Sequence, residues 1–176
     1  MRTLVSGLVL IAGLGCGVGA TSNGPLGPPG SRGSLCLLAD SSGRAVDGFL
    51  ALHNRGGSPV EIQSLRLKNA RGIVVVNAVV VPARRHVLVG ARAGVYDEHD
   101  PFLGDAYDDR QAIPGAVLSA HDGVDRNLVL DLRSTRPNSD GQADGIELRY
   151  ASDGRAYRWE SRSAIRVGPV GGACTT

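Results

Sequence analysis

The chain has 176 residues, a formal net charge of +2 and a hydrophobic fraction of 42%. A chain of this length is expected to form one domain, with enough residues to bury a core. The nearly balanced charge lacks the basic excess that marks proteins binding nucleic acid, so nucleic acid is excluded as a partner. Lys68 is the only lysine among nineteen basic residues, which indicates the codon bias of a GC-rich genome.

The first twenty residues have the pattern of an export signal. Arg2 precedes an apolar stretch, residues 4–14. This stretch is too short for a permanent transmembrane helix, which needs roughly 20 residues, but it fits the apolar region of a signal peptide. The mature chain is therefore expected to be extracytoplasmic.

Two cleavage sites compete at the end of this segment. In the first, the signal segment with its lipidation site is residues 1–16: cleavage before Cys16 and a lipid on the cysteine would give a membrane-anchored lipoprotein. Cleavage after Ala20 would give a signal peptide of residues 1–20 and a soluble secreted protein. The position of Cys16 favours lipidation, although Gly13 stands where a lipobox has leucine.

The three cysteines support export, because an oxidising compartment permits disulfides. With Cys16 assigned to the anchor or to the discarded peptide, Cys36 and Cys174 remain as a pair. We expect them to form a disulfide that joins the two ends of the domain. Two buried free thiols are the alternative.

Residues 17–34 are rich in glycine and proline and show no hydrophobic period, so they are expected to be a flexible linker. Residues 35–176 are expected to be the folded domain. Short apolar or alternating segments with polar turns follow one another there, and no amphipathic helix is apparent. The expected strands are 34–40, 46–54, 60–67, 72–82, 86–91, 116–120, 127–133, 145–151, 155–161 and 164–168.

Two of these segments have patterns that predict local features. In residues 60–67, Val60 and Ile62 have one parity and Leu65 and Leu67 have the other, which predicts a β-bulge near Gln63-Ser64. Residues 72–82 are almost wholly apolar and β-branched. They are expected to be a strand buried on both faces or two short strands.

The hairpin around Asp153-Gly154 is the clearest local prediction, since this dipeptide suits a type I′ turn. The register places Tyr150 opposite Tyr157 and Leu148 opposite Trp159, on the core face. Glu147, Arg149, Arg158 and Glu160 then lie on the outer face. The diagonal pairs Arg149–Glu160 and Glu147–Arg158 are opposite in charge and within reach, or else these are merely solvated charges.

Residues 50–67, with a strand, an Asn-x-Gly turn and a Val-x-Ile-x-x-Leu-x-Leu strand, resemble bacterial extracytoplasmic immunoglobulin-like domains. The features Pro114-Gly115, Asn127 to Leu130, the tyrosines of the hairpin and Cys174 resemble small secreted proteins of actinobacteria. The resemblance covers roughly residues 35–175 and implies architecture alone, because that group offers no catalytic motif to transfer. Together with the strand pattern, it predicts an all-β, antiparallel immunoglobulin-like β-sandwich of about 8–10 strands.

Residues 92–115 interrupt the strands with six carboxylates and two prolines. Acids such as Asp97 and Asp100 could bind a cation or a basic partner, but a solvated loop is the simpler interpretation. The aromatic residues among them, Tyr96, Phe102 and Tyr107, are expected either to fold back over the sandwich or to contact a partner.

Residues 138–147 resemble an oxygen-rich calcium loop, with Asp140 and Asp144 at alternate spacing. The glutamate that would complete such a loop is missing, since Ala151 holds its position. A polar loop between strands is the simpler interpretation, and no cofactor is expected.

No nucleophile, base and orienting residue recur in a known catalytic pattern. We therefore expect a non-catalytic binding or interaction module, displayed outside the cell, for an unknown cell-envelope or extracellular partner. The alternative is a hydrolase or metal-dependent enzyme. It would need the carboxylates of residues 97–109 to converge with His86 or His121.

Overall fold

The computed structural model describes residues 24–27, 32–83, 89–95, 107–120, 125–136 and 138–174. These residues form strands and no helix, so none of them belongs to a helix that could cross a membrane. The strands are β1 (Gly33–Leu37), β2 (Arg44–Leu52), β3 (Val60–Lys68), β4 (Ile73–Pro82), β5 (Gly90–Ala93), β6 (Gln111–Ala112), β7 (Val117–Leu118), β8 (Arg126–Ser134), β9 (Gly141–Ala143), β10 (Gly145–Ser152), β11 (Arg155–Glu160) and β12 (Ser163–Val167).

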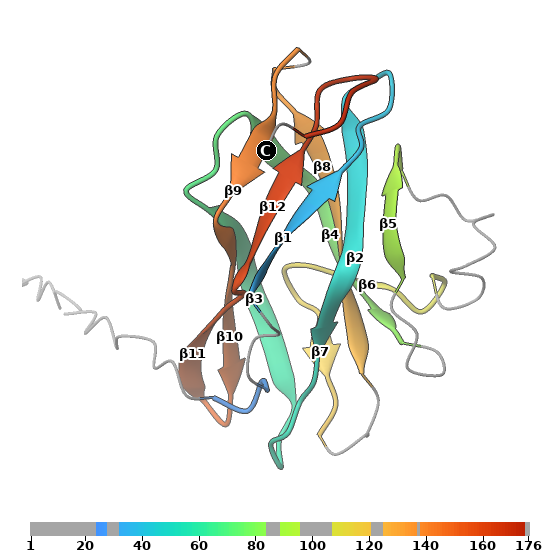
Figure 1. Ribbon diagram of the computed structural model, residues 1–176. Helices are drawn as coiled ribbons and strands as arrows, with labels where there is room; N and C mark the ends of the chain where they lie inside the picture. The colour runs from blue at the N-terminus through green and yellow to red at the C-terminus, as the bar shows by residue number, and fades with distance from the viewer. Residues whose placement is uncertain are drawn as a thin grey trace, which may run out of the picture.

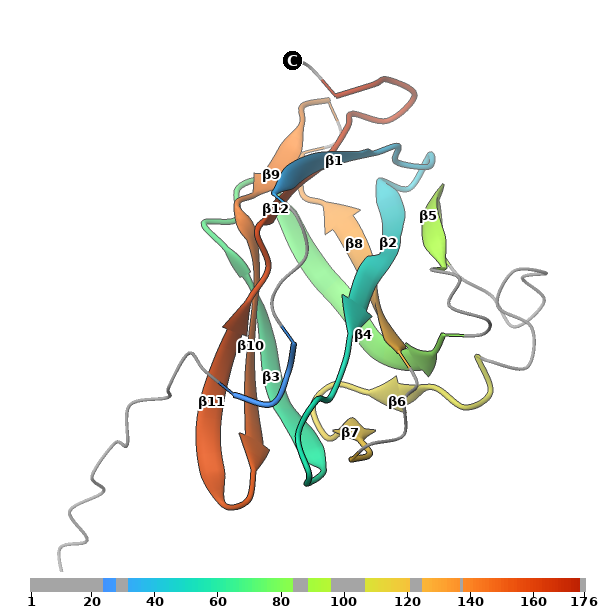
Figure 2. The same ribbon diagram turned by 60° about the horizontal axis from the view of Figure 1, so that its bottom comes forward.

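The strands form the expected β-sandwich. One sheet has the order β11-β10-β3-β7, and it faces a second sheet with the order β5-β2-β8-β4-β6 (Figures 1 and 2). A third, small sheet, β1-β12-β9, lies at one end of the sandwich. The main core lies between the layers, with Ile62, Leu148 and Tyr150 from the first sheet and Leu128 and Leu130 from the second.

The β10–β11 hairpin has the predicted register. Tyr150 lies opposite Tyr157, and Leu148 lies opposite Trp159. Asp153 and Gly154 have φ angles of 50° and 69°, as a type I′ turn requires. The two tyrosine rings stack with their centroids 5.4 Å apart. The turn chemistry and the alternation of the flanking residues therefore sufficed to specify this hairpin.

The bulge predicted in β3 is also confirmed. Arg149 of β10 pairs with Ser64, but the next residue, Tyr150, pairs with Ile62, so Gln63 is the extra residue. The extra residue lets Val60 and Ile62 reach the core while Leu65 and Leu67, of opposite parity, pack against it further along.

Strand β4 is a single strand, and its second half is buried on both faces. Ala78 and Val80 face the main core. Val79 and Val81 form a second cluster on the other face of the sheet, against which Tyr107 packs. Of the two alternatives for the aromatic residues, folding back or contact with a partner, Tyr107 follows the first. Tyr96 and Phe102 lie outside the described residues.

The structure departs from the expected antiparallel pattern at β1, which pairs with β12 in parallel, Leu35 opposite Ile165. The β1–β12 pairing continues to Gly168, whose N–H donates to the Leu37 carbonyl at 2.9 Å, and the chain then turns back where Gly172 N–H donates to the Pro169 carbonyl at 3.0 Å. This return brings Cys174 to Cys36, and the expected disulfide is present with Cα atoms 6.0 Å apart. Strands β6 and β9 were not expected from the sequence. Each has only two or three residues, too few to show a period.

Residues Gly24–Gly27 lie within the segment that composition predicts to be a linker, yet they pack into the domain. Leu26 is buried in the core and forms a β-bridge with Asn54. Gly27 N–H donates to the His53 carbonyl, and its own carbonyl accepts the Trp159 indole N–H, both at 2.9 Å. A Cβ on Gly24 would lie 2.1 Å from the Tyr150 hydroxyl oxygen, so only glycine fits there.

We expect Leu26→Ala to lower the free energy of unfolding by about 2 kcal/mol or more, because Leu26 is only 6% exposed and its removal leaves a cavity. Leu38→Ala is the matched control: Leu38 is 55% exposed and should cost less than about 0.5 kcal/mol. Urea unfolding of the mature domain measures both. Equal effects for the two variants would contradict the packing of residues 24–27.

Candidate functional site

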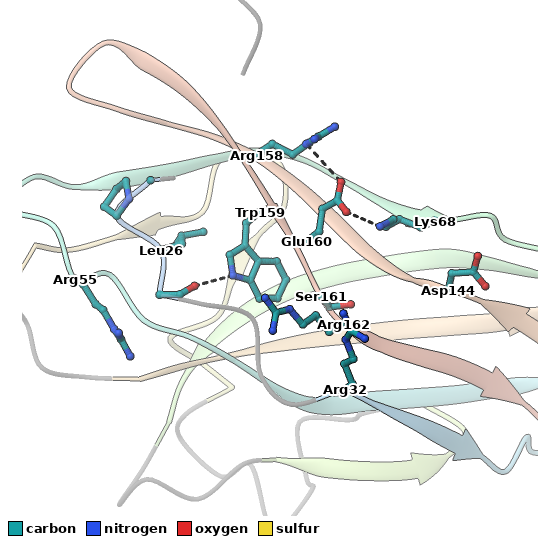
Figure 3. Close-up of a pocket in the computed structure, with 13 residues that line it drawn as sticks. Leu26, Arg32, Arg55, Lys68, Asp144, Arg158, Trp159, Glu160, Ser161 and Arg162 are labelled. Carbon is teal, nitrogen blue, oxygen red and sulfur yellow. Dashed lines mark hydrogen bonds and ion pairs between the residues drawn. The ribbon is translucent and has the colours of Figure 1, made fainter. Parts of the chain in front are cut away.

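A groove of about 960 Å³ runs beside the edge of β11 (Figure 3). One wall is the N-terminal segment Gly24–Gly27 with Arg32, and the other is the chain from Arg158 to Arg162. Arg55, Lys68 and Asp144 complete the lining. The groove therefore exists only because the N-terminal segment docks next to an edge strand.

The strand period positions the side chains of the β11 wall. Trp159 points inward and is buried, whereas Arg158 and Glu160 lie on the outer face of the sheet. At the end of the strand, the Ser161 hydroxyl accepts the Ile146 N–H at 2.8 Å and so holds the bend that leads to Arg162. Trp159, anchored to Gly27, forms the floor of the groove.

The opposite end of the groove is held by the turn after β2. The buried Asn54 side chain donates to the carbonyls of Ser58, Leu118 and Ser119 at 2.9–3.1 Å, and its oxygen accepts the Gly56 N–H. Arg55 N–H donates to the Pro25 carbonyl. The Arg55 guanidinium lies over Gly27, where a Cβ would be 3.0 Å from Nε. The turn thereby presents Arg55 to the groove.

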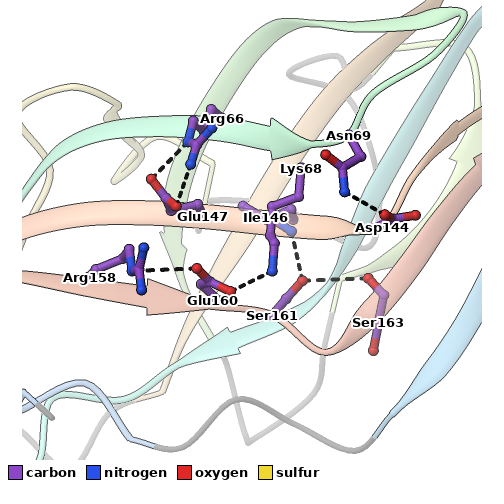
Figure 4. Close-up of polar contacts among 10 residues, drawn as sticks. All are labelled: Arg66, Lys68, Asn69, Asp144, Ile146, Glu147, Arg158, Glu160, Ser161 and Ser163. Atoms are coloured by element: carbon purple, nitrogen blue, oxygen red, sulfur yellow. Dashed lines mark hydrogen bonds and ion pairs between the residues drawn. The ribbon is translucent and has the colours of Figure 1, made fainter. Parts of the chain in front are cut away.

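Three arginines of the groove, Arg32, Arg55 and Arg162, are exposed, and their guanidinium groups make no hydrogen bond or ion pair with any described residue. The other two cations, Lys68 and Arg158, share one carboxylate. Glu160 accepts from Lys68 at 2.5 Å and lies 3.4 Å from Arg158 (Figure 4). Asp144, the second acid of the lining, accepts from the Asn69 amide at 2.7 Å. Three positive charges are left without a counter-charge among the lining residues.

The outer face next to the groove carries a buried carboxylate. Glu147 is 1% exposed and accepts from Arg66 at 2.8 and 2.6 Å, with Arg149 3.4 Å away (Figure 4). The hydrogen bonds from Arg66 hold the pKa of Glu147 below its usual value. This ion pair clamps β3 to β10.

The predicted diagonal pairs Arg149–Glu160 and Glu147–Arg158 are wrong. Glu147 pairs instead with Arg66, which stands directly opposite it on β3. Lys68 reaches across β10 to Glu160 because the residue between them, Gly145, has no side chain. The prediction treated the hairpin in isolation, and the third strand offers the carboxylates closer partners.

The candidate metal ligands are not brought together among the described residues. Asp140 and Asp144 lie on either side of β9, where Arg71 and Gln142 exchange two main-chain hydrogen bonds of 2.8 Å. No group of three or more His, Cys, Asp or Glu side chains forms in the described part of the chain. Asp97, Asp100, His86, His121 and Cys16 lie outside the described residues.

No sequence pattern indicated the arginine groove. Arg32 stands in the expected linker, Arg55 in a turn and Arg162 between two strands. They share no motif or spacing, and each is ordinary in a chain whose basic residues are nearly all arginine. Only tertiary packing brings them to one place.

No protein-family model matches the chain, and no curated protein matches its sequence. Among solved structures, one match is the VesB protease of Vibrio cholerae, with 12% sequence identity and a TM-score of 0.36. The match covers 82% of this chain but 32% of the protease chain.

We expect the Glu147–Arg66 pair to make the free energy of unfolding depend on pH in the acid range. Because the folded-state pKa of Glu147 is lowered, its contribution is present above the unfolded pKa of about 4.3 and is lost as pH falls through the folded value. Glu147→Gln should be less stable than wild type at pH 7, with the difference shrinking in acid. Urea unfolding between pH 7 and pH 3 measures this.

The control for this measurement is Glu61→Gln, which removes an exposed glutamate from β3. Its stability curve should run parallel to that of the wild type. A constant difference between Glu147→Gln and wild type across the pH range would contradict the assignment.

Proposed function

We propose that the chain is a non-catalytic extracytoplasmic binding module and that the groove beside β11 is its site for an anionic ligand. The observation that carries the proposal is the convergence of Arg32, Arg55 and Arg162, exposed and without a counter-charge in the lining. Guanidinium groups bind carboxylates, phosphates and sulfates through paired hydrogen bonds, so such a cluster favours an anion.

The other lining residues fit binding better than catalysis. Among the described lining residues, Ser161 is the one that carries a hydroxyl, and this hydroxyl is engaged by the Ile146 N–H and the Ser163 carbonyl. A serine nucleophile needs a free hydroxyl next to a base, and no hydroxyl of the described lining residues is free. The alternative enzyme, with a site near residues 97–109, has no specific observation in its favour here.

The disulfide between Cys36 and Cys174 fits an oxidising compartment outside the cytoplasm. We further propose that Cys16 carries the lipid anchor. Cys16 precedes Gly24, the first residue of the groove wall, by eight positions, so a fully extended chain would hold the groove within about 29 Å of the anchored residue. The ligand would then be met close to the membrane surface.

We expect the triple variant R32Q/R55Q/R162Q to weaken binding of polyglutamate about tenfold or more at low salt, since three guanidinium contacts are removed. The matched control R71Q/R133Q/R136Q removes the same charge from exposed arginines outside the groove lining and should change the affinity less than about twofold. Isothermal titration calorimetry on the mature domain measures both. Equal losses in the two variants would show diffuse attraction and would contradict the site.

We expect Cys16→Ala to release the protein from the membrane to the medium in a host that lipidates exported proteins. The acyl chains on a diacylated cysteine hold a protein stably in the membrane, and the Cys16→Ala variant cannot receive them. Detergent phase partition and the mass of the mature N-terminus provide the measurement. A wild-type N-terminus at Thr21 in the aqueous phase would overturn the lipoprotein proposal in favour of free secretion.

A further inference from the structure

Strand β11 is an edge strand of its sheet, and six residues make it much longer than β7, which ends the sheet on the other side. Among the described residues it pairs with β10 alone, Trp159 opposite Leu148. Ser161 N–H donates to the Ile146 carbonyl at 2.8 Å, which identifies positions 161, 159, 157 and 155 as those that bond to β10. A type I′ hairpin gives the same alternation.

The intervening residues, Ala156, Arg158 and Glu160, therefore direct their main-chain N–H and C=O groups away from β10, toward the free edge. Within the described residues none of these groups has a hydrogen-bond partner. The groove lies along this edge at Arg158 to Arg162. It thus combines a row of open main-chain donors and acceptors with uncompensated positive charge.

The charged side chains lie on both sides of this edge. Arg158, Glu160 and Lys68 lie on one side of the β11 ribbon, and Arg32, Arg162 and Trp159 lie on the other (Figure 3). A strand added to β11 would direct alternate side chains to these two sides. On the side of Arg32 and Arg162, its side chains would meet cations that have no counter-charge.

We propose that β11 binds an extended acidic segment of a partner protein by strand addition. The proposal rests on the proposed function and deepens it: the main-chain groups of Ala156, Arg158 and Glu160 pair with the segment, and Arg32, Arg55 and Arg162 select its carboxylates. Main-chain pairing gives affinity in this mode of recognition, and side-chain contacts give specificity.

Two other occupants fit the surface less well. A second copy of the chain, paired β11 to β11, would bring the uncompensated arginines of two grooves together, and like charges oppose such pairing. An acidic polysaccharide would satisfy the arginines but would leave the alternating N–H and C=O groups of the edge without strand partners. An acidic peptide satisfies both features.

The decisive experiment uses the wild-type domain, so that no variant has to fold. The probe is a terminally blocked peptide of alternating glutamate and valine, prepared unmodified, N-methylated at every glutamate, or N-methylated at every valine. In a strand, successive N–H groups point to opposite edges. We expect one methylated series to lose affinity about tenfold or more and the other to stay within about twofold of the unmodified peptide.

A companion experiment changes the protein. Arg158→Pro removes an N–H that points to the free edge, a position where proline is tolerated in an edge strand, and it should abolish binding of the unmodified peptide. Arg158→Ala removes the same charge but keeps the N–H, and it should bind within about threefold of wild type. Circular dichroism and urea unfolding establish that both variants are folded.

Each result has one meaning. Equal affinity of both N-methylated series, together with loss of binding in R32Q/R55Q/R162Q, would overturn strand addition but keep the anion site, as for an acidic polysaccharide. Equal affinity of the two arginine triple variants would overturn the anion site itself. If the domain dimerises without peptide and Arg158→Pro abolishes the dimer, the occupant of the β11 edge is a second copy of the chain, and the proposal of an acidic peptide is overturned.

Discussion

The alternation along β11 is the constraint on which the groove depends. The Asp153-Gly154 turn fixes the register with β10, and the register puts Trp159 inside and Arg158 and Glu160 outside. The same register decides which main-chain groups bond to β10 and which remain on the free edge. A shift by one residue would bury charge, expose the indole and remove the floor of the groove.

The N-terminal segment turns this hairpin into a site. Trp159 has an indole N–H that requires a partner once the ring is buried, and the Gly27 carbonyl supplies it at 2.9 Å. Leu26 fills the core beside it, and Gly24 leaves room for the Tyr150 hydroxyl. The groove wall is therefore packed into the core of the sandwich, although residues 24–27 and the hairpin are far apart in sequence.

The charges on the outer face divide into two groups with different roles. Glu147 and Glu160 are satisfied by Arg66, Lys68 and Arg158, and these pairs hold β3, β10 and β11 together. The groove arginines come from three separate segments. Neither acid of the described lining, Glu160 or Asp144, is paired with any of them, and this is the physical basis of the anion site.

Period-two patterning and turn chemistry are local, so the sequence by itself determined the all-β class, the hairpin register and the bulge at Gln63. For residues 72–82 it left two alternatives, and the structure decided for one strand buried on both faces in its second half. The sequence also determined the Cys36–Cys174 pair, once the third cysteine was assigned to the export signal. The parallel pairing of β1, the docking of Gly24–Gly27 and the partners of Glu147 depended on which segments meet in space. The net charge of +2 does not indicate that three positive charges gather in one groove. The convergence of Arg32, Arg55 and Arg162 also depended on the tertiary structure, because residues with no common spacing become neighbours only when the chain has packed.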